Sequence, residues 1–239
     1  LVHPLTLKET RLMMNVRNLI LLSCVSSYAF AAVADGKPYS VPVDADYPKS
    51  VYWGDTHLHT RNSADAYSLG NMNLSPADAF RFAQGQELIA HNGMRVQLRR
   101  PLDFLVVSDH AEYLGGYYRF NVGDSLVTET SAGKQWQGYL EEGDPVKLIA
   151  AFTASMSDPE NNYPFPEKVR RLIWEDVAIT ADEHNKPGRF TAFTGYEWTS
   201  MIEGNNLHRV VVYKDGADKT TQLPPFSGQD SLDPRELWK

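Results

Sequence analysis

The chain has 239 residues, and its 23 Lys and Arg against 30 Asp and Glu give a net charge of −7. A content of 42% hydrophobic and 22% charged residues is typical of a globular protein and argues against a disordered, collagen-like or coiled-coil chain. The acidic balance and the lack of a basic stripe disfavour nucleic-acid binding.

The first part of the chain has the pattern of a secretory signal peptide. We interpret residues 1–12 as upstream translated sequence and 13–31 as the signal peptide, with a basic start, a short apolar run and Ala-Phe-Ala at the cleavage site. The apolar run is too short to cross a bilayer, which takes about 20 apolar residues. Leu22 fits a lipoprotein box at Cys24 poorly. We therefore expect a secreted or periplasmic protein, with a lipoprotein as the weaker alternative. After removal of the signal peptide, the mature chain would have no transmembrane segment and no cysteine.

Beyond an extended lead-in over residues 32–50, the sequence pattern alternates between strands and helices. This alternation predicts an α/β fold with parallel strands. The expected elements are strands over 51–53, 104–107, 190–196 and 207–213, and helices over 75–90, 145–156 and 166–183. A further capped helix starts at Asp233 and Pro234, only a few residues before Lys239. Because one turn is not a stable helix alone, we expect the natural protein to continue and this chain to be a fragment.

Side chains of the metal-ligand type follow three of these strands and open the fourth. His57 and His59 are two residues apart, so in an extended segment both imidazoles point to the same side. Functional groups collect at the carboxyl ends of parallel strands. All the candidate ligands except His208 would lie at such strand ends. The set comprises His57, His59, Asp65, His110, Glu197 and His208. Together these residues predict one metal site.

Glu197 lies between Tyr196 and Trp198, where a carboxylate without a partner is unusual. A metal ion would supply that partner, and Glu197 could bridge two ions. With imidazole and carboxylate ligands only, zinc, manganese or iron is expected. Paired ions can hold a hydroxide and clamp a phosphate oxygen, which is the design of a hydrolase that needs no side-chain nucleophile.

Four motifs carry a resemblance to a known family. They are Gly54-Asp55-Thr56-His57-Leu58-His59-Thr60 with Asp65, Ser108-Asp109-His110, Gly195 to Ser200, and Asn206-Leu207-His208-Arg209. As a set they resemble the PHP (polymerase and histidinol phosphatase) superfamily. They are closest to a secreted bacterial group filed as domain of unknown function 3604. The resemblance covers roughly residues 50–239.

The resemblance implies a distorted seven-stranded (β/α) barrel and metal-assisted hydrolysis of a phosphate ester, with two or three divalent ions. His57 and His59 would bind one ion, and Glu197 would bridge to a second that His208 also binds. Asp65 and His110 would bind a third ion or complete the cluster, with Asp109 orienting its neighbours. PHP sites also use a later His and an Asp-x-His pair, which this chain lacks. We therefore expect residues 51–239 to be the N-terminal part of a PHP-like domain, with an incomplete barrel.

Arg61 and Arg209 lie next to ligands and could contact a small anionic substrate, since Arg suits phosphate geometry. Two other functions stay open. An amidohydrolase-type enzyme also opens with His-x-His and would act on amides or lactones, but no lysine stands at a strand end to bridge its metals. A secreted metal-binding module would bind metal without turnover. Phosphodiesters remain possible substrates because a metal-dependent nuclease needs no basic stripe.

Overall fold

The computed structural model describes residues 49–143, 146–148, 150–151, 154 and 164–239. The chain divides into residues 1–50 and a compact unit over 51–239, and only the second unit is described below. The expected signal peptide, nearly all of the expected lead-in, and much of the expected helix over 145–156 lie outside the described residues.

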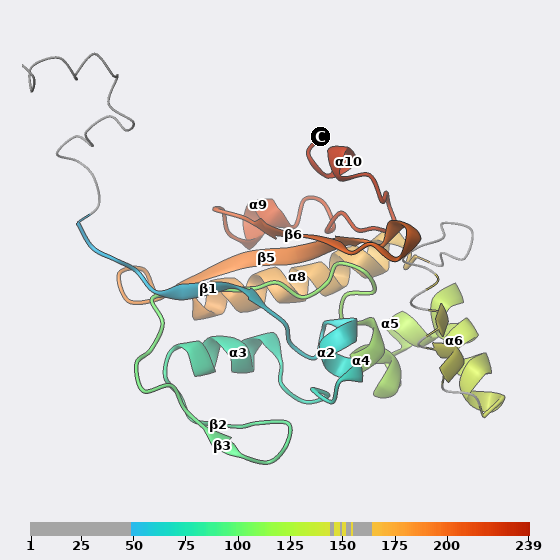
Figure 1. Ribbon diagram of the computed structural model, residues 1–239, viewed down its shortest axis with the longest axis horizontal. Helices are drawn as coiled ribbons and strands as arrows, with labels where there is room; N and C mark the ends of the chain where they lie inside the picture. Colours follow the sequence, from blue (N-terminus) through green and yellow to red (C-terminus); the bar gives the residue numbers. More distant parts are fainter. Residues whose placement is uncertain (1–48, 144–145, 149, 152–153, 155–163) are drawn as a thin grey trace, which may run out of the picture. The chain divides into compact units, whose positions relative to one another are not determined.

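Four strands form one sheet in the order β1-β4-β5-β6. Figure 1 labels β1, β5 and β6 of this sheet. The bounds of the strands are β1 Gly54–Leu58, β4 Phe104–Val107, β5 Thr191–Ser200 and β6 Leu207–Val212. The expected first strand over 51–53 is wrong, because β1 begins only at Gly54. β1, β4 and β5 run parallel, as expected, but β6 pairs with β5 antiparallel. Residues of the two edge strands, β1 and β6, come within 8 Å of each other between Cα atoms. The sheet is therefore curled into a half-barrel, and the fold is mixed α/β.

Helices and a small hairpin surround this sheet. The hairpin pairs β2 Leu88–Ile89 with β3 Arg95–Val96. The helices are α2 Ala64–Ser68, α3 Pro76–Ala83, α4 Gly116–Asn121, α5 Ser125–Thr128, α6 Ser131–Glu141, α8 Glu167–His184, α9 Ala217–Thr220 and α10 Pro234–Leu237, with a 3-10 turn η2 at Ile202–Gly204. Within the described residues, none of the helices combines the length and apolarity needed to cross a bilayer.

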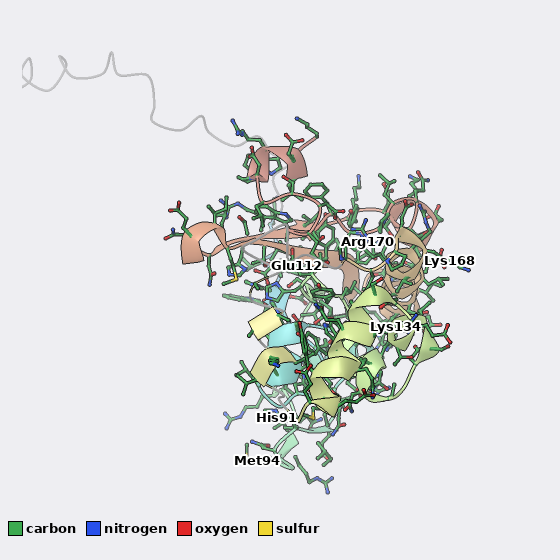
Figure 2. The ribbon with its side chains drawn as sticks, turned by 90° about the vertical axis from the view of Figure 1, so that its right-hand side faces the viewer. His91, Met94, Glu112, Lys134, Lys168 and Arg170 are labelled. Carbon is green, nitrogen blue, oxygen red and sulfur yellow. The ribbon has the colours of Figure 1, made fainter. Side chains whose placement is uncertain are left out.

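Helix α3 begins where the sequence predicts and ends earlier. Ser75 and Asp78 form a reciprocal capping box, with the Ser75 hydroxyl accepting from the Asp78 N–H. The expected continuation to Ala90 is wrong, because Gly85 adopts a left-handed φ of 84° just after the helix end. The following residues turn back as the β2–β3 hairpin. Figure 2 shows His91 and Met94 at the outer end of this hairpin, well away from Glu112.

One part of the core forms where α3 and α8 cover one face of the sheet, and a larger part forms where α8 packs with α6 and the later half of β5. Leu105 and Val107 of β4 and Ala192 of β5 pack on this side against Phe80 of α3 and Ala181 of α8. Helix α8 lies along β5 (Figure 1), and its buried residues recur at the spacing expected from the sequence. Because side chains alternate along a strand, Glu197 of β5, five residues after Ala192, lies on the opposite, concave side of the curled sheet.

Candidate metal centre

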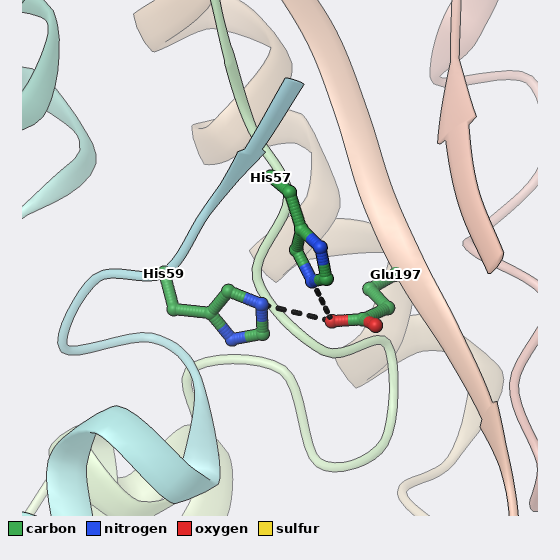
Figure 3. Close-up of side chains that lie close together, drawn as sticks. All are labelled: His57, His59 and Glu197. Carbon is green, nitrogen blue, oxygen red and sulfur yellow. Dashed lines mark hydrogen bonds and ion pairs between the residues drawn. The ribbon is translucent and has the colours of Figure 1, made fainter. Parts of the chain in front are cut away.

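Two imidazoles from the first strand meet one carboxylate oxygen. His57 lies in β1, and His59 follows its end. Nε2 of His57 lies 2.9 Å from Oε2 of Glu197, and Nε2 of His59 lies 2.8 Å from the same oxygen. Figure 3 shows both rings directed at that oxygen. The spacing of two residues therefore brings both side chains to one point, as expected.

Glu197 joins this pair to a third histidine. The Glu197 side chain is only 1% exposed, and its other oxygen, Oε1, lies 3.1 Å from Nδ1 of His208. Antiparallel pairing sets Thr199 opposite His208, which explains how a residue at the start of β6 reaches the carboxyl end of β5. The expected end of this strand at residue 196 is wrong, because β5 continues through Glu197 to Ser200.

His110 reaches the cluster because the pairing of β4 with β5 continues past the end of β4. His110 and Glu197 form an isolated parallel bridge, and the Ala111 N–H donates to the Glu197 carbonyl at 2.8 Å. Nε2 of His110 lies 3.6 Å from Oδ2 of Asp65, whose other oxygen lies 3.2 Å from Nδ1 of His59. Asp65 stands in the first turn of α2, with an exposed side chain.

The structure thus brings all six predicted ligands together in three overlapping groups. Within each group the potential ligand atoms lie within 4.8 Å of one another. The groups are His57 with His59 and Glu197, His59 with Asp65 and His110, and His110 with Glu197 and His208. Because each group shares a residue with another, the arrangement can serve adjacent ions. That these residues bind metal stays a prediction.

Asp109 has a different position from the six. It is buried, and its two oxygens accept from the Thr60 N–H at 2.5 Å and from the Thr60 hydroxyl at 2.7 Å. These bonds connect the segment after β4 to the segment after β1. Burial raises the Asp109 pKa to about 6, although the Thr60 bonds act in the other direction. Asp109 is therefore placed to orient the loops that carry His59 and His110.

The electrostatics of the cluster follow from its mixture of imidazoles and carboxylates. Burial opposes a charge on His59, but hydrogen bonds to Asp65 and Glu197 outweigh it and raise the His59 pKa to about 10. Burial also favours neutral carboxyls, yet the histidines around Asp65 and Glu197 hold both pKa values below their usual range. The His208 pKa is lowered by burial and by the neighbouring imidazoles. The carboxylates thus stay ionised and attract positive charge.

Sequence reasoning missed two residues, Glu112 and Thr199. The Thr199 hydroxyl lies 2.9 Å from Nδ1 of His110 and 3.0 Å from Nδ1 of His208. Glu112 is fully buried, and burial raises its pKa to about 7. Thr199 could have been found because it lies two residues after Glu197 in the same strand and so shares its face. Glu112 follows His110 by two residues in a loop, where no periodicity applies.

A pocket of about 270 Å³ opens beside the cluster. Its lining residues are Asp65, His110, Glu112, Thr199, Met201, Asn206 and His208. Arg61 instead lines a different pocket, where its guanidinium lies 3.8 Å from the centre of the Tyr118 ring. Arg209 is exposed and donates to the His208 carbonyl at 2.7 Å. Substrate binding by Arg61 and Arg209 stays a prediction.

Fold and cluster together define a mixed α/β protein with a candidate metal centre on the concave side of a curled sheet. Residues 46–239 match the model of the family described as "Protein of unknown function (DUF3604)". The chain belongs to this family, which confirms that part of the resemblance seen in the motifs. Neither a curated protein nor a solved structure matches the chain.

Proposed function

We propose that this protein is a metal-dependent hydrolase of the PHP type that acts on phosphate esters. The supporting observation is the position of Glu197. One of its oxygens faces His57 of β1 and His59 just after β1, and the other faces His208 from β6. A carboxylate with nitrogen ligands on both sides has the place of a bridging ligand between two ions.

The chemistry of the donors fits a divalent metal. Imidazole nitrogen and carboxylate oxygen suit zinc, manganese and iron. His57 and His59 would hold one ion together with Glu197, and Glu197 with His208 would hold a second. Asp65 and His110 would hold a third, because a neutral imidazole has one free nitrogen and binds one ion. When bound, the ions would activate water and stabilise negative charge on a phosphoryl oxygen.

The protein's own residues supply position and shape. Asp109 connects the loops after β1 and β4, so His59 and His110 keep a fixed separation. The pocket of about 270 Å³ beside Asp65 and His208 offers room for a small anionic substrate. We further propose that the curled sheet is part of a distorted (β/α)7 barrel, and that the protein acts in the periplasm or outside the cell.

A panel of substrates tests this function. The whole chain, loaded with zinc, manganese or iron in turn, is assayed against a phosphomonoester, a phosphodiester, an anilide and a lactone. We expect turnover of a phosphoester, lost in Glu197→Gln and kept in Glu183→Gln, whose carboxylate is exposed. Turnover of only the anilide or the lactone would favour an amidohydrolase-type enzyme. Bound metal with no turnover of any substrate would favour a secreted metal-binding module.

A further inference from the structure

Glu112 is a buried carboxylate next to the candidate metal centre, and its two oxygens have different surroundings. Oε1 accepts two backbone hydrogen bonds, from the Thr199 N–H at 3.1 Å and from the Gly228 N–H at 2.6 Å. Oε2 is enclosed and has no hydrogen bond among the described residues. Nδ1 of His110 lies 3.7 Å from this oxygen. A buried carboxylate oxygen of this kind requires a donor, and His110 faces it.

The position of Glu112 is fixed by the backbone on both sides. A Cβ added at Gly228 would lie 2.2 Å from the Thr199 carbonyl oxygen, so only glycine allows the chain to come this close. The Gly228 N–H therefore lies close enough to donate to Oε1, and the Thr199 N–H of β5 is the second donor. With Oε1 held by two donors, Oε2 is left to face His110.

His110 has two ring nitrogens and a choice between two ligand groups. Nε2 lies 3.6 Å from Asp65, whereas Nδ1 lies 3.6 Å from Oε2 of Glu197. A neutral imidazole carries its proton on one nitrogen and binds metal through the other. The group that donates to or accepts from the ring therefore decides which nitrogen is free.

We propose that Glu112 is a positioning residue that accepts the Nδ1 proton of His110 and so directs Nε2 to the metal ion at Asp65. This inference rests on the proposed function, because it assigns His110 to one of the proposed ions. Carboxylate–histidine–metal arrangements fix the tautomer and the orientation of the ring in this way. In this tautomer the Thr199 hydroxyl, 2.9 Å from the same nitrogen, would accept from the same proton.

The substitution Glu112→Gln reverses this contact without changing the size of the side chain. The two backbone donors of Thr199 and Gly228 hold the amide oxygen in the place of Oε1. The amide N–H2 must then face Nδ1 of His110 and donate to it. His110 would carry its proton on Nε2, where no lone pair remains for the ion at Asp65.

The experiment combines two readouts on the whole chain. NMR correlation of the imidazole nitrogens and ring protons, on the metal-free chain at a pH where the ring is neutral, identifies the tautomer of His110. Loss of its signals in His110→Gln assigns them. Zinc titration measures the affinity of each bound ion. Asp65→Asn is the comparison variant for loss of that ion, and Glu183→Gln is the control.

We expect the Nδ1–H tautomer in the wild-type chain and the Nε2–H tautomer in Glu112→Gln. We also expect one zinc ion, the ion lost in Asp65→Asn, to bind about 10–100-fold more weakly in Glu112→Gln. A wild-type Nε2–H tautomer, an unchanged tautomer in the variant, or an altered tautomer with unchanged zinc affinity would each overturn the inference. If the wild-type chain binds no zinc, the titration is repeated with manganese and iron. Failure to bind all three contradicts the proposed function and the assignment of His110 to an ion, while the tautomers alone still report whether Glu112 accepts from His110.

Discussion

The substitution Glu197→Gln tests the candidate metal centre more directly than any other single substitution. The substitution keeps the volume of the side chain and removes its charge. Two of the three ligand groups include Glu197, and the third consists of His59, Asp65 and His110. A chain that binds three ions should therefore retain one at most. The surviving ion should be the one that Asp65→Asn removes.

The same change has a calculable effect on the metal-free chain. Oε2 of Glu197 lies 2.8 Å from Nε2 of His59, which is charged at pH 7 because its pKa is raised to about 10 by its carboxylate partners in spite of burial. A hydrogen bond to a charged group contributes about 1.5–3 kcal/mol. We expect the free energy of unfolding to fall by about that amount, since Asp65 still partners His59.

Elemental analysis of dialysed protein gives the number of ions, and urea unfolding with chelator present, followed by tryptophan fluorescence, gives the stability. Glu183→Gln should change the free energy of unfolding by less than about 0.5 kcal/mol, because its side chain is exposed. Unchanged metal content in Glu197→Gln would refute the assignment of Glu197 as a shared ligand. Unchanged stability would refute its pairing with His59.

Three further predictions concern pH and packing. The pKa of His59 is raised to about 10. The pairing of the charged His59 ring with its carboxylates therefore stabilises the metal-free chain fully below about pH 6.5, and this stabilisation is lost towards pH 10. Urea unfolding across that pH range measures the loss. Leu105→Ala removes a fully buried side chain and should cost about 2–5 kcal/mol in the same assay. Gly195→Ala places a Cβ 2.4 Å from Val106 and should lower the free energy of unfolding by about 1–3 kcal/mol. Gly138→Ala, which has open space around it in α6, should raise the free energy of unfolding. Equal effects of the two substitutions would contradict the packing argument.

Local patterns predicted much of the fold. The apolar run of β4 and the helical spacing of α8 are strong signals, and both elements occur within a residue of the expected bounds. The capping box at Ser75 also marked the start of α3 correctly. The antiparallel direction of β6 was missed although the connection over residues 201–206 is short. A parallel crossover needs a dozen or more residues, so that length allows only a hairpin-like return.

Local patterns likewise predicted one part of the candidate site and missed another. Residue type and strand position were enough to select the six candidate ligands that the structure brings together. Glu112 was beyond such reasoning because its hydrogen-bond partners, Thr199 and Gly228, lie 87 and 116 residues away in the sequence. Its role depends on which loop packs against which strand, and no local pattern carries that information. Long-range contacts, rather than residue types, decide the surroundings of the ligands.

The metal content of the purified chain tests the proposed centre most directly. The wild-type chain and a His57→Ala/His59→Ala variant are dialysed and analysed for zinc, manganese and iron, with circular dichroism to show that both are folded. We predict close to one or more ions per wild-type chain and a loss of bound metal in the variant, because these two histidines supply ligands to two of the three groups. A folded wild-type chain that holds no metal, even after incubation with each ion, would contradict the metal centre.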